Sequence, residues 1–465
     1  MKNALLLLVL SLVAAHSHAQ SGVRVYDYKN QWNSDNALLD VGTYTGSAIP
    51  NNLNNRISSI KIFSGYQVVF SENEDGTGYS KTYISQVGHV NENLPDELHN
   101  KASFIRVLPI STSQKKGVGK TETSGGVSYA QDMNASWYYN WTATGDTSTT
   151  IEFVPMVHTW TGSGVFSKID NLKNKVSHLL GFNEPDNDHE AGSRGILKNP
   201  VTAADEYEKL LPTGLRLGSP VTTQNNDLNS VWLEPFLSEA YHLDVKVDYI
   251  AVHWYDWDSN PKNTRGADPD HIFNRFKNDL LAIHAKYGLP IWVTEFNANP
   301  WRWTYVQKGF MEKALPWLES QNFIERYAWF ECFQVDSVKA RCNLKENGSL
   351  TDLGSYYSAH SSTDAIPENK WIDPVLLSGS ELDNNSSSRK TTIRNGTNDV
   401  SIQIVPNPVN NYLRIKGIDD DTSIQIFDMQ GKLLLKNSGR MTDVSSLAPG
   451  IYLVQFGDTV SRFVK

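Results

Sequence analysis

The chain has 465 residues and a formal net charge of −9. Domains usually contain on the order of 100 to 200 residues, so two or three folded units are expected. The negative charge gives no sign of the basic surface that nucleic-acid binding requires, and a neutral polymer is an easier partner. The 13 tryptophans and 20 tyrosines agree with a sugar polymer, because flat aromatic faces stack on sugar rings, although such residues also fill cores.

Residues 1–20 have the pattern of an export signal peptide. Lys2 supplies the positive start, residues 5–15 form the apolar stretch, and residues 18–20 offer a cleavage point. No later stretch is apolar enough to span a bilayer. We therefore expect a soluble protein without a transmembrane segment, secreted or held at the cell surface.

Residues 22–110 alternate polar and apolar residues in short runs, which predicts β-strands such as Ser59–Ile62 and residues 66–70. Residues 54–62 are echoed by residues 99–107. A repeated β unit predicts two similar motifs packed as a β-sandwich.

This segment resembles a βγ-crystallin domain, and residues 54–59 match that family's calcium-binding pattern of two Asn or Asp, two variable residues and Ser/Thr-Ser. The resemblance implies a Ca²⁺ site with candidate ligands Asn55, Ser58, Asn100 and Ser103. Oxygen ligands of this kind suit hard Ca²⁺. The second copy departs from the pattern, since it begins at a histidine and ends at a phenylalanine, and Asn and Ser also cap ordinary turns.

Residues 115–368 alternate apolar runs with amphipathic helical stretches. Several runs are almost continuously hydrophobic, as in strands that are buried on both faces. The predicted strands are residues 116–119, 136–141, 152–157, 178–183, 215–220, 247–255, 291–296 and 326–330. The clearest helix begins at Asp268 and Pro269 and ends before Gly288. Eight strands alternating with helices over roughly 250 residues predict a (β/α)8 TIM barrel.

Two glutamates end otherwise apolar strands. Glu184 follows the fourth predicted strand, where Pro185 is expected to hold it extended, and Glu295 lies at the end of the seventh. Active sites of such barrels lie at the carboxyl ends of the strands. Glycosidic cleavage needs one carboxyl group to protonate the leaving oxygen and another to act at the anomeric carbon. The pair therefore predicts a glycoside hydrolase.

The barrel segment resembles glycoside hydrolase family 128, a family of TIM-barrel endo-β-1,3-glucanases. The resemblance rests on residues 136–141, 153–157, 180–186, 252–255, 294–296 and 327–330. It implies that Glu184 is the general acid/base and Glu295 the nucleophile of a retaining reaction. It also implies that Asn183 reaches the substrate 2-hydroxyl, and that His253 and Tyr255 orient Glu295 or the sugar.

Members of family 128 hold glucan on aromatic side chains. The resemblance therefore makes four aromatic residues candidate sugar platforms: Trp137, Tyr138, Trp160 and Trp329. Each of them can equally be a core residue.

The C-terminal part contains a polar linker at residues 369–399 and strand patterning in residues 400–465 that predicts a small β-sandwich. Residues 406–408, 428–432 and 447–452 resemble the C-terminal sorting domain of the bacterial type IX secretion system. This resemblance implies passage through the outer membrane and the secretion machinery as a partner. A further binding module is the alternative.

Cys332 and Cys342 are the two cysteines of the chain. An oxidising compartment favours a disulfide between two cysteines so close in sequence.

Taken together, the sequence predicts a multidomain, secreted, retaining β-1,3-glucanase that acts on polysaccharide and needs no cofactor for catalysis. Two alternatives stay open. One is a hydrolase for another β-glycan, since barrels of this kind share their carboxylates across many specificities. The other is a non-catalytic surface protein that binds calcium or carbohydrate.

Overall fold

The computed structural model describes residues 22–32, 35–110, 113–120, 125–159, 162, 164–188, 195–223, 232–256, 265–331, 334–335, 338–339, 341–365, 403–405, 412–416, 422–429, 431–439, 441–457 and 459–465. The chain divides into two compact units, one ending at Ser378 and one beginning at Gly379. The expected export signal and linker lie outside the described residues. Within the described parts, no helix has the length and apolar character needed to cross a membrane.

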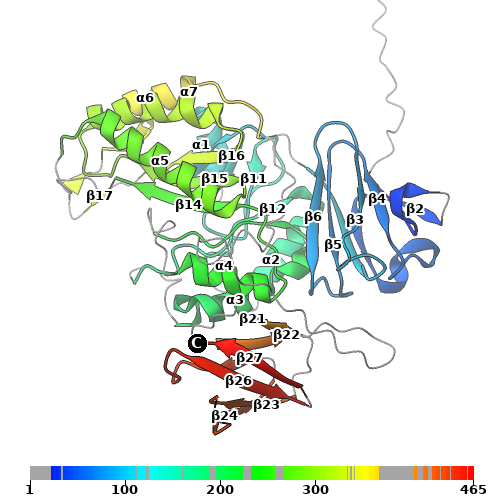
Figure 1. Ribbon diagram of the computed structural model, residues 1–465. Coiled ribbons are helices and arrows are strands. Elements are labelled where there is room, and N and C mark those ends of the chain that lie inside the picture. The colour runs from blue at the N-terminus through cyan, green and yellow to red at the C-terminus, as the bar shows by residue number, and fades with distance from the viewer. Residues whose placement is uncertain are drawn as a thin grey trace, which may run out of the picture. The chain divides into compact units, whose positions relative to one another are not determined.

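The N-terminal segment contains two antiparallel sheets of four strands each (Figure 1). The first sheet, ordered β2-β1-β4-β7, consists of β1 (Val23–Tyr26), β2 (Asn36–Leu39), β4 (Ser59–Ile62) and β7 (Val90–Asn93). The second sheet, ordered β3-β8-β5-β6, consists of β3 (Gly42–Thr45), β5 (Tyr66–Ser71), β6 (Ser80–Ser85) and β8 (Phe104–Pro109). Three short 3₁₀ turns accompany them: η1 (Lys29–Gln31), η2 (Gly46–Ala48) and η3 (Pro50–Asn52).

The repeat seen in the sequence corresponds to a repeat in the sheets. Each copy ends in a central strand, β4 in the first sheet and β8 in the second. Strands β1–β4 form the first half of the segment and β5–β8 the second. Each half contributes one strand to the sheet of the other half, since β3 pairs with β8 and β7 pairs with β4. Side chains from both sheets, among them Val25, Ile60, Phe70 and Ile105, share one buried core. This exchange joins the two halves.

The next segment contains eight parallel strands that pair in a closed circuit. Six form one sheet, ordered β11-β10-β9-β16-β15-β14, and two form the pair β12-β13. Single bridges from Met156 to Leu180 and from Gly218 to Tyr249 join the pair to the sheet on either side. The strands are β9 (Lys116–Gly119), β10 (Trp137–Tyr139), β11 (Glu152–Phe153), β12 (His178–Leu179), β13 (Arg216–Leu217), β14 (Ile250–Tyr255), β15 (Ile291–Asn297) and β16 (Ile324–Trp329).

Helices lie between these strands in sequence, and α5 and α6 cover β14–β16 (Figure 1). The helices are α1 (Gly125–Asp132), α2 (Val165–Leu172), α3 (Pro200–Glu208), α4 (Leu233–His242), α5 (Pro269–Tyr287), α6 (Thr304–Ser320) and α7 (Asp352–Ala359). Short elements complete the segment: η4 (Lys173–Lys175), η6 (Gly195–Lys198), η7 (Leu211–Thr213), β17 (Gln334–Val335), β18 (Val338–Lys339), β19 (Lys345–Glu346) and β20 (Ser349–Leu350).

The predicted bounds of helix α5 are confirmed. The Asp268 side chain accepts a hydrogen bond from the Asp270 amide at the start of the helix. Gly288 ends it with φ of 66°, a left-handed conformation that suits glycine.

Large side chains fill the space inside the strand circuit. Trp137, Tyr249 and Trp292 belong to one buried cluster, and the Tyr249 and Trp292 rings stack with centroids 4.2 Å apart. Gly117 makes room for them, because a Cβ there would lie 2.1 Å from the Trp137 ring. The interior is therefore a packed core.

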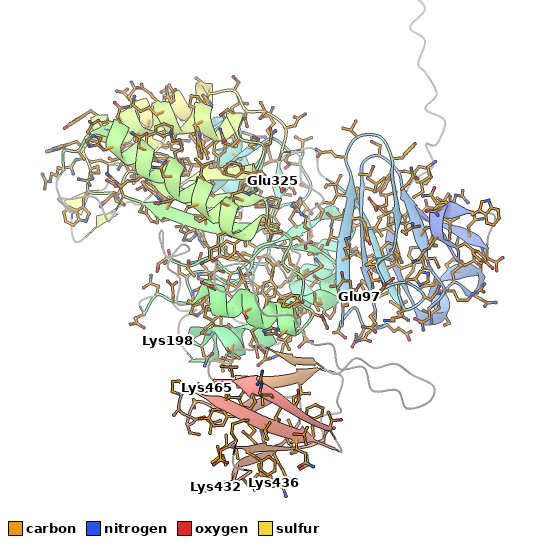
Figure 2. All side chains as sticks on the ribbon, viewed as in Figure 1. Glu97, Lys198, Glu325, Lys432, Lys436 and Lys465 are labelled. Carbon is orange, nitrogen blue, oxygen red and sulfur yellow. The ribbon has the colours of Figure 1, made fainter. Side chains whose placement is uncertain are left out.

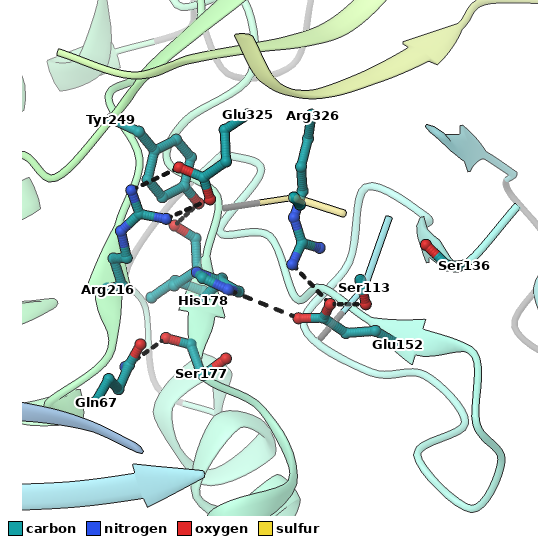
Figure 3. A network of polar contacts seen from close by, with 12 residues as sticks. Gln67, Ser113, Ser136, Glu152, Ser177, His178, Arg216, Tyr249, Glu325 and Arg326 are labelled. Carbon is teal, nitrogen blue, oxygen red and sulfur yellow. Dashed lines mark hydrogen bonds and ion pairs between the residues drawn. The ribbon is translucent and has the colours of Figure 1, made fainter. Parts of the chain in front are cut away.

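Buried ion pairs hold the amino ends of these strands together (Figure 3). Arg216 bonds both oxygens of Glu325, at 2.5 and 2.7 Å, and all these groups are about 1% exposed. Arg326 donates to Glu152 at 2.7 Å. His178 lies 3.8 Å from Glu152, and burial holds the pKa of this histidine well below its usual value. His178 is therefore neutral, and Arg326 balances the Glu152 charge.

The second unit consists of two antiparallel sheets, ordered β21-β22-β25 and β24-β23-β26-β27. The strands are β21 (Gln403–Val405), β22 (Tyr412–Lys416), β23 (Ser423–Phe427), β24 (Leu433–Ser438), β25 (Met441–Asp443), β26 (Ile451–Phe456) and β27 (Thr459–Val464). Their apolar side chains form a core of their own that includes Leu413, Ile426 and Phe463. Lys432, Lys436 and Lys465 belong to this unit (Figure 2).

Candidate active site

Glu184 lies just beyond β12, where the chain turns sharply. Its amide donates to the Val221 carbonyl at 2.8 Å, and Asn183 forms a parallel bridge with Val221. The φ angle of Glu184 is 42°, in the left-handed region. The predicted extended conformation is therefore wrong. Such a backbone costs of order 1–3 kcal/mol in a non-glycine residue and is found chiefly where the surroundings enforce it, often at functional sites.

Two side chains bind the Glu184 carboxylate. Nδ1 of His253, on β14, lies 2.9 Å from Oε1, and the Asn187 amide donates to Oε2 at 2.8 Å. The carboxylate is 13% exposed. The group is thus oriented by protein contacts while one side stays open to solvent.

Glu295, near the end of β15, is almost fully buried and receives several donors. Tyr255 donates to Oε2 at 2.5 Å, and the Trp141 indole donates to Oε1 at 3.0 Å. The Tyr139 hydroxyl donates to the Thr294 carbonyl and lies 3.4 Å from Oε1 of Glu295. These contacts come from two different strands and fix the position of both carboxylate oxygens.

His253 lies between the two glutamates. Its Nε2 is 3.4 Å from Oε1 of Glu295, on the opposite side of the ring from Glu184. One oxygen of Glu184, one ring nitrogen of His253 and one oxygen of Glu295 all lie within 4.8 Å of one another. The two carboxyl groups therefore lie close together at the carboxyl ends of the strands.

Burial and the neighbours shift the pKa values of the two carboxyl groups in opposite directions. Burial raises the pKa of Glu295, and the adjacent Glu184 raises it further. The contacts with His253, Tyr255 and Trp141 lower this pKa but do not outweigh the other two effects. Burial also acts to raise the pKa of Glu184, but His253 and Asn187 together outweigh it, so the pKa of Glu184 is lowered.

Nδ1 of His253 lies 2.9 Å from Oε1 of Glu184, so one proton can be shared between these two atoms. Transfer of the Nδ1 proton to Oε1 of Glu184 yields a protonated carboxyl group beside a neutral imidazole, and the proton count does not change. Nε2–H of the ring then still faces Glu295. Because the three groups are in contact, the protonation state of each depends on the other two.

The structure brings some of the other predicted residues to this site. Tyr255 binds Glu295 directly, as described above. Asn183 is 4% exposed, and its Oδ1 has no hydrogen-bond partner among the described residues. Trp160 lies outside the described residues.

The burial of three predicted sugar platforms contradicts that role. Trp137 is 0% exposed inside the strand circuit, and its indole donates to the Lys115 carbonyl. Tyr138 points the other way, into the core against the helices, because side chains alternate along a strand. Trp329 is 1% exposed, and its indole donates to the Cys342 carbonyl.

Three residues of the site were not singled out from the sequence. Tyr139, on β10, and Trp141, two residues beyond the end of β10, follow Trp137 at alternate positions, and both contact Glu295. The alternation was a usable signal. Asn187 lies three residues after Glu184, in a turn that has no periodic pattern.

Three of the candidate calcium ligands, Ser58, Asn100 and Ser103, form side-chain contacts between the two N-terminal motifs. Ser58 donates to Oδ1 of Asn100 at 3.1 Å, and Ser103 donates to Oδ1 of Asn54 at 2.8 Å. Asn55 and Asn100 both have left-handed backbones, with φ of 55° and 59°. Each motif thus contributes an amide oxygen and a hydroxyl oxygen, a donor set that fits hard Ca²⁺.

Cys342 is buried. Its expected partner Cys332 lies outside the described residues, so the disulfide remains a prediction.

Two carboxyl groups that lie close together at the carboxyl ends of parallel strands form the type of site that glycoside hydrolases use. The comparisons agree. The sequence model of the glycosyl hydrolase catalytic core matches residues 117–357, more than half of the chain, so the chain belongs to this family. A secretion system C-terminal sorting domain matches residues 403–465, which indicates an exported protein that is secreted or held at the surface.

Individual relatives are also similar. Alkali-sensitive linkage protein 1 of Schizosaccharomyces pombe is 29% identical over 238 residues, which span 48% of this chain and 40% of that protein. The chain thus spans less than half of the length of this relative.

Solved structures include a family 128 (subgroup I) endo-β-1,3-glucanase from Amycolatopsis mediterranei in complex with laminaripentaose. It is 28% identical, with a TM-score of 0.44, over 53% of this chain and 99% of that chain. A family 128 (subgroup III) curdlan-specific exo-β-1,3-glucanase from Blastomyces gilchristii is also 28% identical, with a TM-score of 0.41, over 53% of this chain and 98% of that chain.

Proposed function

We propose that this protein is a secreted, retaining endo-β-1,3-glucanase with Glu184 as general acid/base and Glu295 as nucleophile. The observation that carries the proposal is the separation of the carboxyl groups, with oxygens of Glu184 and Glu295 within 4.8 Å. Inverting enzymes need a wider gap of ~6.5–9.5 Å to admit a water molecule. The substrate class rests on the sequence motifs shared with family 128, and it is the class named for the solved relatives.

In the first half of the reaction, an Oε atom of Glu295 attacks the anomeric carbon from one face of the sugar. The glycosidic bond breaks, and its oxygen takes the proton of Glu184. In the second half, Glu184 removes a proton from water, the water oxygen attacks the same carbon, and the bond to Glu295 breaks. Two inversions restore the starting configuration.

The neighbours of the two glutamates suit these roles. Tyr255 and Trp141 donate to Glu295, and such donors favour the ionised form that a nucleophile needs. His253 acts as a positioning residue that shares a proton with Glu184. The unpartnered Oδ1 of Asn183 is available to a substrate hydroxyl, and a hydrogen bond there strengthens as the oxocarbenium-like state develops.

The fold supports the same proposal. The closed circuit of eight parallel pairings supports a (β/α)8 barrel for residues 115–368. The exchange of strands between two four-stranded sheets supports a βγ-crystallin-like domain for residues 22–110. Within that domain, we propose that Asn55, Ser58, Asn100 and Ser103 hold Ca²⁺ as a structural ion, apart from the catalytic chemistry.

Variants of the two glutamates test the assignment. Glu184→Ala and Glu295→Ala should each lower turnover of laminarin by at least 10³-fold, as is usual for essential catalytic groups. Added azide should then give a β-glycosyl azide with Glu184→Ala and an α-glycosyl azide with Glu295→Ala, because azide replaces water in one case and the nucleophile in the other. Asp188→Asn, at an exposed carboxylate paired with Lys198, is the matched control. Near-full turnover by either alanine variant would refute the mechanism.

A substrate panel tests the specificity. Reducing-sugar release should be greatest on laminarin and lower on mixed-linkage glucan, mannan and xylan. Faster cleavage of another β-glycan would keep the mechanism and replace the substrate.

A further inference from the structure

We propose that Tyr28 and Trp32, on the N-terminal domain, form a second glycan-binding site that holds the polymer apart from the active site. Trp32 is 75% exposed and Tyr28 is 59% exposed. The two residues lie directly before and directly after the same 3₁₀ turn, η1. Most other described tryptophans are buried, including Trp137, Trp254 and Trp292, each at 0%. Trp303 at 39% and Tyr305 at 64% are also exposed, but Trp32 is the most exposed of the described tryptophans.

The turn that presents the rings is held in a costly conformation. Asn30 and Gln31 have φ of 60° and 59°. Asparagine tolerates this left-handed region, whereas it costs roughly 1–2 kcal/mol at Gln31. Such a conformation persists only where its surroundings enforce it, and it occurs often at ligand sites.

Two neighbouring strands enforce this turn. Asn93, on β7, accepts from the Asn30 amide at 2.7 Å and donates to the Asn30 side chain at 2.9 Å. Ser59, on β4, accepts from the Gln31 amide at 3.0 Å and donates to the Tyr28 carbonyl at 2.6 Å. The Gln31 side chain donates to the Ile60 carbonyl at 3.0 Å. The backbone beneath both rings is thus fixed before any ligand arrives, and a preorganised surface loses little entropy on binding.

The chemistry around the rings indicates a neutral sugar polymer. Asn30, between the two rings in sequence, is exposed, and its side-chain nitrogen can donate to a sugar hydroxyl. The nearby charges are paired: Lys29 lies 4.0 Å from Asp96, and Arg56 contacts both Asp27 and Asp35. Flat aromatic faces suit the C–H faces of pyranose rings.

The size of the patch argues against a protein partner. Two aromatic side chains bury at most about 150–250 Å² each, whereas a specific protein interface uses about 800 Å² per partner. A single glycan chain is small enough to be held by two rings. The choice of β-1,3-glucan as the polymer rests on the proposed function.

The test uses the full chain carrying Glu295→Gln, so that the polymer is not cleaved, and insoluble β-1,3-glucan (curdlan) particles as the probe. Depletion from solution should show that Tyr28→Ala/Trp32→Ala binds at least tenfold more weakly than its parent. Val87→Ala, at a 90% exposed apolar residue of the same domain, is the matched control and should bind as the parent does. An unchanged melting temperature would establish that the double variant is folded.

Activity of the chain with Glu295 intact gives a second readout. The double variant should cleave soluble laminaripentaose at the parent rate but degrade curdlan several-fold more slowly. Equal binding of parent and double variant to curdlan would overturn the proposal. It would also be overturned if the double variant bound curdlan normally but no longer associated with other copies of the chain, because the two rings would then form a protein contact. Binding to curdlan that depends on Trp32 would support this site even if the active site cleaved a different polymer.

Discussion

Nδ1 of His253 lies 2.9 Å from Oε1 of Glu184, while Nε2 of the same ring lies 3.4 Å from Oε1 of Glu295. One imidazole therefore connects the proposed acid/base to the proposed nucleophile. A proton can move between His253 and Glu184 while the Nε2–H still faces Glu295, so the two carboxyl groups can hold different protonation states at one pH.

Replacing His253 should impair the acid step. His253→Asn should lower kcat/KM on laminarin by about 100-fold, the lower end of what acid–base catalysis contributes, and should change the shape of the pH–rate profile. His284→Asn, at a ring stacked on Phe323, should leave the profile unchanged. A loss of rate with an unaltered profile would indicate a merely structural role.

Removing the Tyr255 hydroxyl should raise the pKa of Glu295 further, since that donor favours the ionised carboxylate. The nucleophile must be ionised, so activity is lost as the pH falls through the pKa of Glu295. Tyr255→Phe should therefore move the acidic limb of the pH–rate profile to higher pH, whereas Tyr356→Phe should not. A downward shift would contradict the account.

The ion pair between Arg216 and Glu325 should matter strongly for stability. Arg216→Met leaves a buried carboxylate without its partner and should cost about 3–5 kcal/mol in the free energy of unfolding by urea. Combining it with Glu325→Leu should restore part of the loss, because both charges are then gone. Lys286→Met breaks the more exposed contact with Glu234 and should cost less than about 1 kcal/mol. Equal losses from both single variants would contradict the burial argument.

Calcium should stabilise the N-terminal domain. Millimolar Ca²⁺ should raise the melting temperature of the chain, and chelation should reverse the rise, since a ligand that binds the folded state stabilises it by mass action. Ser58→Ala should abolish the shift, whereas Ser64→Ala, whose hydroxyl bonds the Gln86 carbonyl, should retain it. No shift in the parent chain would refute the calcium site.

The strand order around the site could be predicted because apolar runs separated by helical patterns are strong signals. The eight predicted segments coincide with β9–β16, although β11, β12 and β13 are only two residues long. Their predicted lengths exceed this because local sequence does not reveal where the ladder of hydrogen bonds stops.

The site was predicted less completely. The positions of Glu184 and Glu295 followed from the ends of their strands, but the left-handed backbone of Glu184 did not, because neighbouring strands impose it. Trp137, Tyr138 and Trp329 were predicted to bind sugar and instead fill the core. Tryptophan at a strand has the same local pattern in either role, and only tertiary packing distinguishes them.

Trapping of the covalent intermediate tests the central claim most directly. A 2-deoxy-2-fluoro β-1,3-linked glucoside with a good leaving group should inactivate the enzyme, and mass spectrometry should find one sugar attached to the peptide that contains Glu295. A label on Glu184, or full turnover of the reagent with no labelled peptide, would contradict the account.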